Sequence, residues 1–337
     1  MLSLLKDCRD SSLNTILDFL WRQWSAVGVT GNASGHVARV VDPEALFALT
    51  CTFGRYDPRL FDEVLDWMAI HDRFVNIQRM KNVFSQSTFA GRSAMSASTR
   101  ALQRATGNAK WRLLAEDPIV SPNVTPFFLL PDGRPIPTRG KLDPDFKVYG
   151  LQRAPVNLRR LARVFSPEDS ASLLLKLRAL LGVNARSEIL LFLLCNRYGN
   201  SHEIARHTHY FQKTIHDALT DLECSGYVES TKTGRERRFY MSSSELSQAL
   251  IGGGPAPLWV DWPGILAPIE TFWRSLDGSL GSEEDERTVA SELYFMSKRL
   301  AESHALRENV ASSATPKPNR PPQEYLRYFL DALQVLK

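Results

Sequence analysis

Apolar side chains recur at helical spacing through the first 115 residues. Leu13, Ile16 and Leu20 fall at i, i+3 and i+7, which places them on one face of an amphipathic helix. Asp-Pro pairs at 42–43 and 57–58 predict two more helices, because an Asp cap followed by Pro is typical of a helix start. Two short helices joined by a tight turn resemble a degenerate helix-turn-helix, and ordinary helix packing explains the same pattern.

The residue pattern changes between residues 116 and 155, where prolines and Asp-containing turns are frequent and helical spacing is rare. An Asp-Gly pair at 132–133 between apolar residues predicts a short hairpin. Helical spacing resumes over 156–164 and 168–181.

A glycine- and proline-rich linker over 252–257 separates a further helical block from the preceding chain. A Ser- and Pro-rich stretch then precedes a last helix with an apolar stripe, which must be buried on its own chain or on a second copy. The stripe comprises Tyr325, Leu326, Phe329, Leu330, Leu333 and Leu336. The predicted domains are a helical domain at 1–115, a connector at 116–155, a central domain at 156–251, a C-terminal helical domain at 252–310, and a linker with docking helix at 311–337.

The segment from 184 to 242 carries the most specific pattern in the chain. An apolar helix over 186–194 precedes Asn200-Ser201, a pair typical of an N-cap, and the short helix that follows contains the small Ala205. A third helix, over 211–224, buries its apolar positions, and two short strands enclose a basic turn. The expected order is therefore helix, short helix, helix and hairpin.

Polar side chains gather on the opposite face of the third helix and on the hairpin. Such residues reach base edges in a major groove, and basic residues beside a hairpin tip suit phosphate or minor-groove contact. The candidate DNA-binding residues are Ser201, His202, Gln212, Lys213, Thr214, His216, Asp217, Thr220, Lys232, Arg235, Arg237 and Arg238.

Five short motifs in this segment occur in a characteristic order. They are Glu203-Ile204-Ala205, Thr214-Ile215 with Leu219, Leu222-Glu223, Gly226-Tyr227-Val228, and Gly234-Arg235 through Arg238-Phe239-Tyr240. In this order and spacing, residues 184–242 resemble the winged helix-turn-helix domain of ArsR- and MarR-type bacterial transcription regulators. The resemblance implies a DNA-reading helix at 212–220 and a basic wing at 232–238. The fold class expected is mainly α, with a winged helix-turn-helix and its small hairpin flanked by N- and C-terminal helical domains.

Charge is distributed unevenly along the chain. Residues 73–115, here called the basic stripe, hold eight Lys or Arg and no Asp or Glu, although the net charge of the whole chain is only +4. A basic stripe is typical of a surface that binds a polyanion. Lysines and arginines on solvent-exposed helix faces explain the same charge pattern equally well. The additional DNA contacts expected from it are Arg79, Lys81, Arg92, Arg100 and Arg104.

Several function classes lack the residues they need. The longest apolar run, 189–195, is far shorter than a membrane span, and the four cysteines form no C-x-x-C pair. Four histidines lie between 202 and 216, but no cysteine or spaced acid completes a zinc set, and His209 and His216 are alternatively phosphate or base contacts. No P-loop, dinucleotide fingerprint or nucleophile elbow occurs. We therefore expect no enzyme, no cofactor, no metal and no membrane contact, and a cytoplasmic, nucleoid-associated location.

The first hypothesis is a sequence-specific regulator, a repressor or autorepressor, that binds double-stranded DNA as a homodimer on a palindrome. The alternative is an antitoxin-like or scaffold protein that binds a partner enzyme through its flanking helical domains, its C-terminal helices among them, and autoregulates its operon. Residues 186–240 carry eight basic and seven acidic residues. A nearly neutral winged helix also suits a protein-interaction module.

Overall fold

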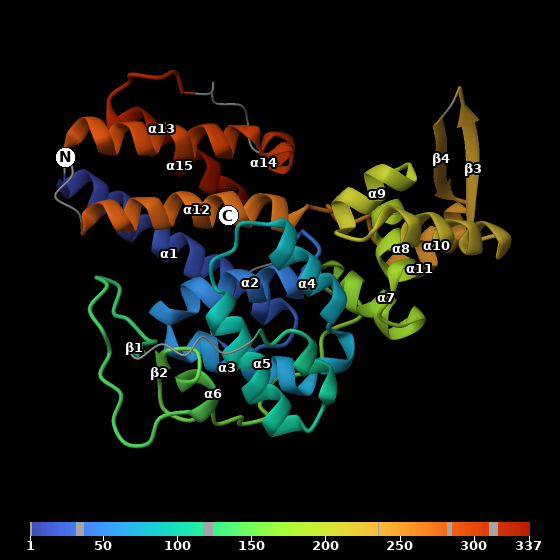
Figure 1. The fold of residues 1–337 in the computed structure, drawn as a ribbon. Coiled ribbons are helices and arrows are strands. Elements are labelled where there is room, and N and C mark those ends of the chain that lie inside the picture. Colours follow the sequence, from blue (N-terminus) through green and yellow to red (C-terminus); the bar gives the residue numbers. More distant parts are fainter. Residues whose placement is uncertain (1, 32–36, 117–123, 235, 282–284, 310–315) are drawn as a thin grey trace.

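The computed structural model describes residues 2–31, 37–116, 124–234, 236–281, 285–309 and 316–337. The fold is mainly helical, as expected, with two small sheets of two strands each among the described residues. Its apolar side chains form two clusters. In the ribbon, residues 173–251 lie at one side of the remaining helices (Figure 1). We call residues 2–172 and 260–337 the helical body and residues 173–251 the helix–hairpin unit.

The N-terminal part of the body begins with helices whose starts follow the predicted caps. Asp42 accepts hydrogen bonds from the amides of Glu44 and Ala45, and Asp57 accepts one from the amide of Leu60. The elements are α1 (Leu2–Ala26), α2 (Pro43–Phe53), α3 (Pro58–Ile70), α4 (Ile77–Gln86) and α5 (Arg92–Thr106), with 3₁₀ turns at Gly54–Tyr56, Asp72–Phe74 and Ala109–Leu113.

The predicted first helix-turn-helix is not an exposed reading module. Ten of the eleven residues of α2 are buried, and the inner face of α3 packs into the same core. A helix that enters a DNA groove needs a polar face open to solvent. Generic helix packing is therefore the correct interpretation of this pattern.

The proline-rich segment is part of the body rather than a free connector. Phe127 and Phe146 are fully buried and pack against Phe61 with ring centroids 4.7 and 6.1 Å away. The predicted hairpin exists as a tight turn, in which the amide of Leu130 donates to the carbonyl of Arg134. The regular elements are β1 (Thr125–Pro126), α6 (Pro144–Lys147) and β2 (Leu151–Gln152), and the two strands are parallel.

The helix predicted over 156–164 is absent; this segment has no regular secondary structure, and Arg160 within it has a left-handed backbone of φ 54°. The carboxylate of Asp66 on α3 accepts hydrogen bonds from the amides of Arg160, Leu161 and Ala162, which a helix would have used internally. A buried acceptor on a neighbouring helix thus overrides the local apolar spacing.

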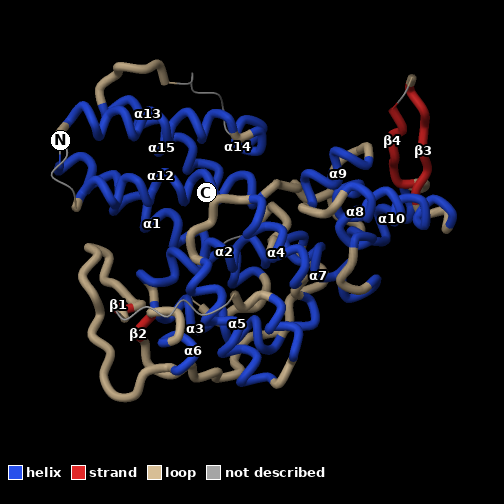
Figure 2. Tube along the Cα trace, in the orientation of Figure 1, coloured by secondary structure: helices blue, strands red, loops and turns tan. Residues whose placement is uncertain are grey.

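The helix–hairpin unit follows the predicted order of elements. After a 3₁₀ turn of the body at Ser170–Ser172, the unit consists of α7 (Leu173–Leu181), α8 (Ala185–Cys195), α9 (Ser201–Thr208), α10 (Gln212–Cys224), β3 (Val228–Thr233), β4 (Glu236–Met241) and α11 (Ser244–Ile251). Strands β3 and β4 are antiparallel, with Ser230 opposite Phe239. The hairpin projects at the end of the molecule far from the body (Figure 2).

The C-terminal helices share one core with the N-terminal helices instead of forming separate domains. They are α12 (Trp262–Leu280), α13 (Glu286–Glu302), α14 (His304–Asn309) and α15 (Pro322–Ala332), followed by a 3₁₀ turn at Leu333–Leu336. The ring centroids of Trp262 and Phe19 of α1 lie 5.0 Å apart. Phe329 of the predicted docking stripe stacks on Phe272, with ring centroids 4.1 Å apart. The terminal stripe is therefore buried on its own chain. None of the helices in the described ranges is both long and apolar enough to span a bilayer.

Candidate nucleic-acid interface

The start of α9 is fixed to the hairpin by backbone and side-chain bonds. The Asn200 side chain accepts from the amide of Glu203 at 2.8 Å, and the Glu203 carboxylate accepts from the amide of Asn200 at 3.4 Å, which completes a capping box. Gly199 and Phe239 exchange two backbone hydrogen bonds of 3.0 and 2.9 Å. A side chain at Gly199 would come within 2.6 Å of the Phe192 ring, so this close approach requires glycine.

The turn between α9 and α10 is anchored on α4 of the body. His209 ends α9 with a left-handed backbone of φ 58°. Arg79 donates from Nε to the carbonyl of Thr208 at 3.0 Å, and Asn82 donates to the carbonyl of His209 at 2.8 Å. These bonds hold the N-terminal end of α10 in one position relative to the body.

The polar face of α10 is open to solvent. Its inner face, Ile215, Ala218, Leu219 and Leu222, is buried as predicted. Every residue predicted to read bases from α10 is exposed: Gln212, Lys213, Thr214, His216, Asp217 and Thr220. His202 at the start of α9 is exposed as well, and Ser201 is half-buried beside it.

The exposed face of α10 lies between two ion pairs with neighbouring elements. Asp221 accepts from Arg186 of α8 at 2.5 Å on one side. On the other side, Arg237 of β4 donates to both oxygens of Glu223 at 2.7 and 2.5 Å. A hydrogen bond from Ser230, followed by the contact with Arg237, holds the pKa of Glu223 below its usual value. Arg237 thus turns toward α10 and is occupied within its own chain, which the sequence did not anticipate.

The remaining predicted hairpin contacts differ in their availability. Lys232 is exposed near the end of β3. Arg238 lies 3.3 Å from Glu236, with its guanidinium carbon 4.8 Å from the centroid of the Tyr198 ring. Arg235 lies outside the described residues.

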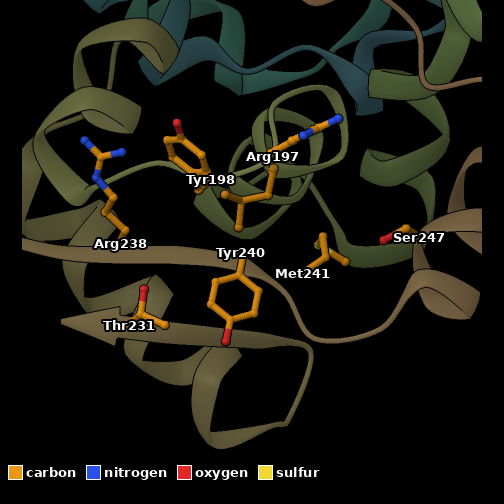
Figure 3. Close-up of a pocket in the computed structure, with 8 residues that line it drawn as sticks. Arg197, Tyr198, Thr231, Arg238, Tyr240, Met241 and Ser247 are labelled. Carbon is orange, nitrogen blue, oxygen red and sulfur yellow. The ribbon is translucent and has the colours of Figure 1, made fainter. Parts of the chain in front are cut away.

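A hollow of about 550 Å³ is lined by both strands of the hairpin, by the end of α8 with the loop after it, and by α11. Figure 3 shows Arg238 beside Tyr198 at one end and Ser247 at the other. Arg197 and Tyr198, both exposed, contribute a cation and an aromatic ring from the loop after α8, and sequence reasoning missed them. The sequence did offer a signal for them, because Arg197 and Tyr198 lie in the short stretch between the end of the apolar run at Cys195 and Gly199. Aromatic rings beside arginines are surfaces on which nucleic-acid bases and phosphates bind.

Most cations predicted from the basic stripe are already paired within the body. Arg79 is 4% exposed and bonds to Asp42 at 2.6 Å and Glu44 at 2.7 Å, so it cannot contact DNA. Burial alone would raise the pKa of Asp42, but the Arg79 charge overcomes this and the pKa lies below its usual value. The other paired cations are Arg92 with Glu116 at 3.1 Å, Arg100 with Asp145 at 3.5 Å, and Arg104 with Asp143 at 3.0 Å.

Lys81 stands apart from these four arginines. It is exposed on α4, two residues after Arg79, whose side chain holds the α9–α10 turn. Within the part of the chain that the structure describes, no carboxylate pairs with it. Of the five additional contacts expected from the basic stripe, Lys81 alone therefore keeps both an unpaired charge and a place beside the helix–hairpin unit.

The four histidines of the unit form no common site. His207 and His209 are buried and turn toward Asp261 of the loop before α12, with N···O distances of 3.9 and 3.3 Å, so His209 cannot contact DNA as one interpretation held. His202 and His216 are exposed on α9 and α10. Among the described residues, no group of three or more His, Cys, Asp or Glu is arranged to hold a metal ion.

No family model, curated protein or solved structure matches the chain. The function of the helix–hairpin unit is therefore argued from its own geometry. Its main elements are a polar helix face, a fixed turn and an adjacent hairpin.

Proposed function

We propose that this chain is a sequence-specific, double-stranded DNA-binding transcriptional regulator that acts as a repressor in the cytoplasm. The helix–hairpin unit serves as a winged helix-turn-helix, with α10 in the major groove and the β3–β4 hairpin on the backbone or in the minor groove. The observation that carries the proposal is the open polar face of α10, held in place by the bonded turn before it.

The dimensions and chemistry of α10 suit a major groove. Its thirteen residues give a length of about 20 Å, and the groove admits one helix. Gln212, Lys213 and Thr214 lie in its first turn, where the positive end of the helix dipole also favours phosphate. These side chains offer both donors and acceptors to base edges.

Few free cations surround this helix, so the electrostatic part of binding is modest. Lys213, Lys232, Arg197 and Lys81 are exposed cations on or beside the unit. If each neutralises one phosphate, one copy of the chain contributes roughly −3 to −4 to the slope of the logarithm of the binding constant against the logarithm of salt, and a homodimer contributes roughly −7. A regulator of this kind gains the rest of its affinity from base contacts and from a second half-site.

Two-fold symmetry supplies that second half-site. A homodimer would place two copies of α10 about 34 Å apart on a palindrome. Because the terminal stripe of α15 is buried on its own chain, the contact between copies must use another surface.

The test is fluorescence anisotropy with the DNA upstream of the coding sequence and a scrambled duplex of equal length, across a salt series. We expect tighter binding to the upstream duplex and a salt slope of roughly −7 for a homodimer, or about half of that if one copy binds. Equal affinity for both duplexes would remove sequence-specific readout. Binding to neither duplex at low salt would overturn the proposal and make the unit a protein-interaction module.

A further inference from the structure

A second hollow, of about 460 Å³, opens where the helix–hairpin unit meets the helical body. It is enclosed by the end of α9, the loop after α4, the first turns of α12 and the joint between α13 and α14. The DNA-facing residues of α10 do not line it. Four segments that are distant in the sequence therefore create one concave site.

The hollow exists because the first turns of α12 carry unusual residues. Pro268 has no amide to donate to the carbonyl of Gly264, and Ser303 of the α13–α14 joint donates to that carbonyl instead at 2.7 Å. A side chain at Gly264 would come within 3.0 Å of the Ala305 methyl group. Small and cyclic side chains, Pro263 and Ala267 among them, consequently leave an apolar floor.

The rim of the hollow is cationic. Arg206 of α9 and Arg299 of α13 line it and are exposed. Neither guanidinium pairs with a carboxylate among the residues described, and Arg206 bonds only to the ring of His207, at 3.1 Å. Two unpaired guanidiniums beside an apolar floor are a combination that attracts an anion with an apolar part.

The His207 ring adds a buried polar atom at the same place. Its side chain is 8% exposed, and Nδ1, at 3.9 Å from the Asp261 carboxylate, has no hydrogen-bond partner among the described atoms. Trp259 packs edge-on against the ring with centroids 5.3 Å apart, and burial holds the pKa of His207 below its usual value. A buried polar atom without a partner favours a ligand that supplies one.

The acid in the hollow is already engaged. Asp261 accepts from the amide of Gly264 at 3.0 Å, which caps α12, and lies 3.3 Å from the His209 ring. His304, the remaining ionisable group of the rim, contacts Glu308 at 3.2 Å. Among the described residues that line the hollow, Arg206 and Arg299 are therefore the cations that pair with no carboxylate, and Asp261 is held by the α12 cap.

We propose that this hollow binds a small organic anion, with its carboxylate or sulfonate between Arg206 and Arg299 and its apolar part on the floor beside Pro263. The site lies apart from the DNA-facing surface and goes beyond the proposed function. Because α9 and α13 belong to different parts of the fold, a bound anion would join the helix–hairpin unit to the body.

The test is a fluorescence titration of the full chain with 1-anilinonaphthalene-8-sulfonate, an aromatic sulfonate that becomes fluorescent in apolar sites. We expect saturable one-site binding that octanoate displaces and inorganic phosphate does not. The double variant Arg206→Gln/Arg299→Gln should weaken binding at least about tenfold, since both charged hydrogen bonds are removed. The matched control Arg307→Gln changes an exposed arginine of α14 outside the hollow and should leave binding within about twofold.

A second variant keeps the test decisive if the double variant does not fold. Thr271→Glu places a carboxylate at the rim, where Thr271 contacts Thr88, and should repel the anion while both arginines remain. Unchanged binding in these variants would show that the probe binds elsewhere and would overturn the proposal. If phosphate displaces the probe as effectively as octanoate does, the apolar floor does not contribute to binding and that part of the proposal is wrong. Since the assay contains no DNA, its failure leaves the DNA-binding proposal standing.

Discussion

The basic stripe of the body and the helix–hairpin unit show opposite relations between sequence charge and surface charge. The stripe holds eight cations and no acid in its own sequence, yet Arg79, Arg92, Arg100 and Arg104 all bond to acids from other segments. The unit is nearly neutral in sequence but keeps the polar face of α10 open. A high density of basic residues in a segment therefore shows that the segment needs anionic partners, and carboxylates of the same chain can be those partners.

The most deeply buried case of such internal pairing is an ion network where the helical body meets the helix–hairpin unit. Arg178 of α7 is fully buried, donates to both oxygens of Glu44 at 2.7 and 2.8 Å, and donates to Glu188 at 2.5 Å. Burial alone would lower the pKa of Arg178, but Glu188 and Glu44 raise it above its usual value.

The largest effect should come from Arg178→Met. Removing this cation leaves Glu44 and Glu188 buried with less compensation, so the free energy of unfolding in urea should fall by about 3–5 kcal/mol. The control Arg92→Gln breaks an exposed pair with Glu116 and should cost less than about 1 kcal/mol. Similar losses in the two variants would show that burial does not distinguish these ion pairs.

The next effect concerns Glu270, a buried carboxylate of the body whose hydrogen-bond partners are neutral. It accepts from the hydroxyl of Thr52 at 2.7 Å and the amide of Ala90 at 2.9 Å. Burial raises the pKa of Glu270 to about 7. The unfolded chain ionises near pH 4.5 and the folded chain near pH 7, so stability should fall as pH rises through this window and stay lower above it.

Glu270→Gln removes that pH dependence and keeps an oxygen for both donors. At pH 8 the variant should be more stable than the unmodified chain by on the order of 3 kcal/mol, while at pH 4.5 the two should be nearly equal. Urea unfolding at both pH values measures this. The exposed Glu302→Gln serves as control, and a pH profile that Glu270→Gln leaves unchanged would refute the assignment.

How much of this could be predicted from sequence depends on whether the signal is local. The caps at Asp42, Asp57 and Asn200 and the inner face of α10 depend on residues a few positions apart, and the structure confirms them. The loss of the expected helix at 156–164 depends on Asp66, and the pairing of Arg79 depends on Asp42 and Glu44. All three acids are distant in sequence from the residues they bind.

The candidate site shows the same division. The periodicity of α10 predicted which of its residues are exposed, because burial of one helix face is a local pattern. The pairing of Arg237 with Glu223 requires the strand to cross the end of α10, and periodicity does not encode that crossing. The shared core of α1 and α12 likewise depends on contacts across more than 200 residues.

A smaller effect compares the two regions in DNA binding directly. Lys213→Ala should weaken binding to the upstream duplex by about 1–3 kcal/mol, and more than binding to the scrambled duplex, because a base contact is lost. Arg100→Ala, in the basic stripe, should change neither affinity by more than about twofold, since Arg100 lies beside Asp145. Anisotropy titrations at one salt concentration measure both. If Arg100→Ala weakens DNA binding as much as Lys213→Ala does, the basic stripe is part of the DNA interface.

The smallest effect tests whether Arg237 is held back from DNA by its own chain. Glu223→Gln weakens the bidentate contact, so Arg237 is freer to reach phosphate and affinity for both duplexes should rise about two- to fivefold. Asp221→Asn is the matched control, because it removes the same charge from α10 but releases Arg186 on the α8 side. A larger gain for Glu223→Gln identifies Arg237 as a phosphate contact. Equal gains would mean that the negative charge of α10 is what opposes DNA and that the hairpin arginine contributes nothing of its own.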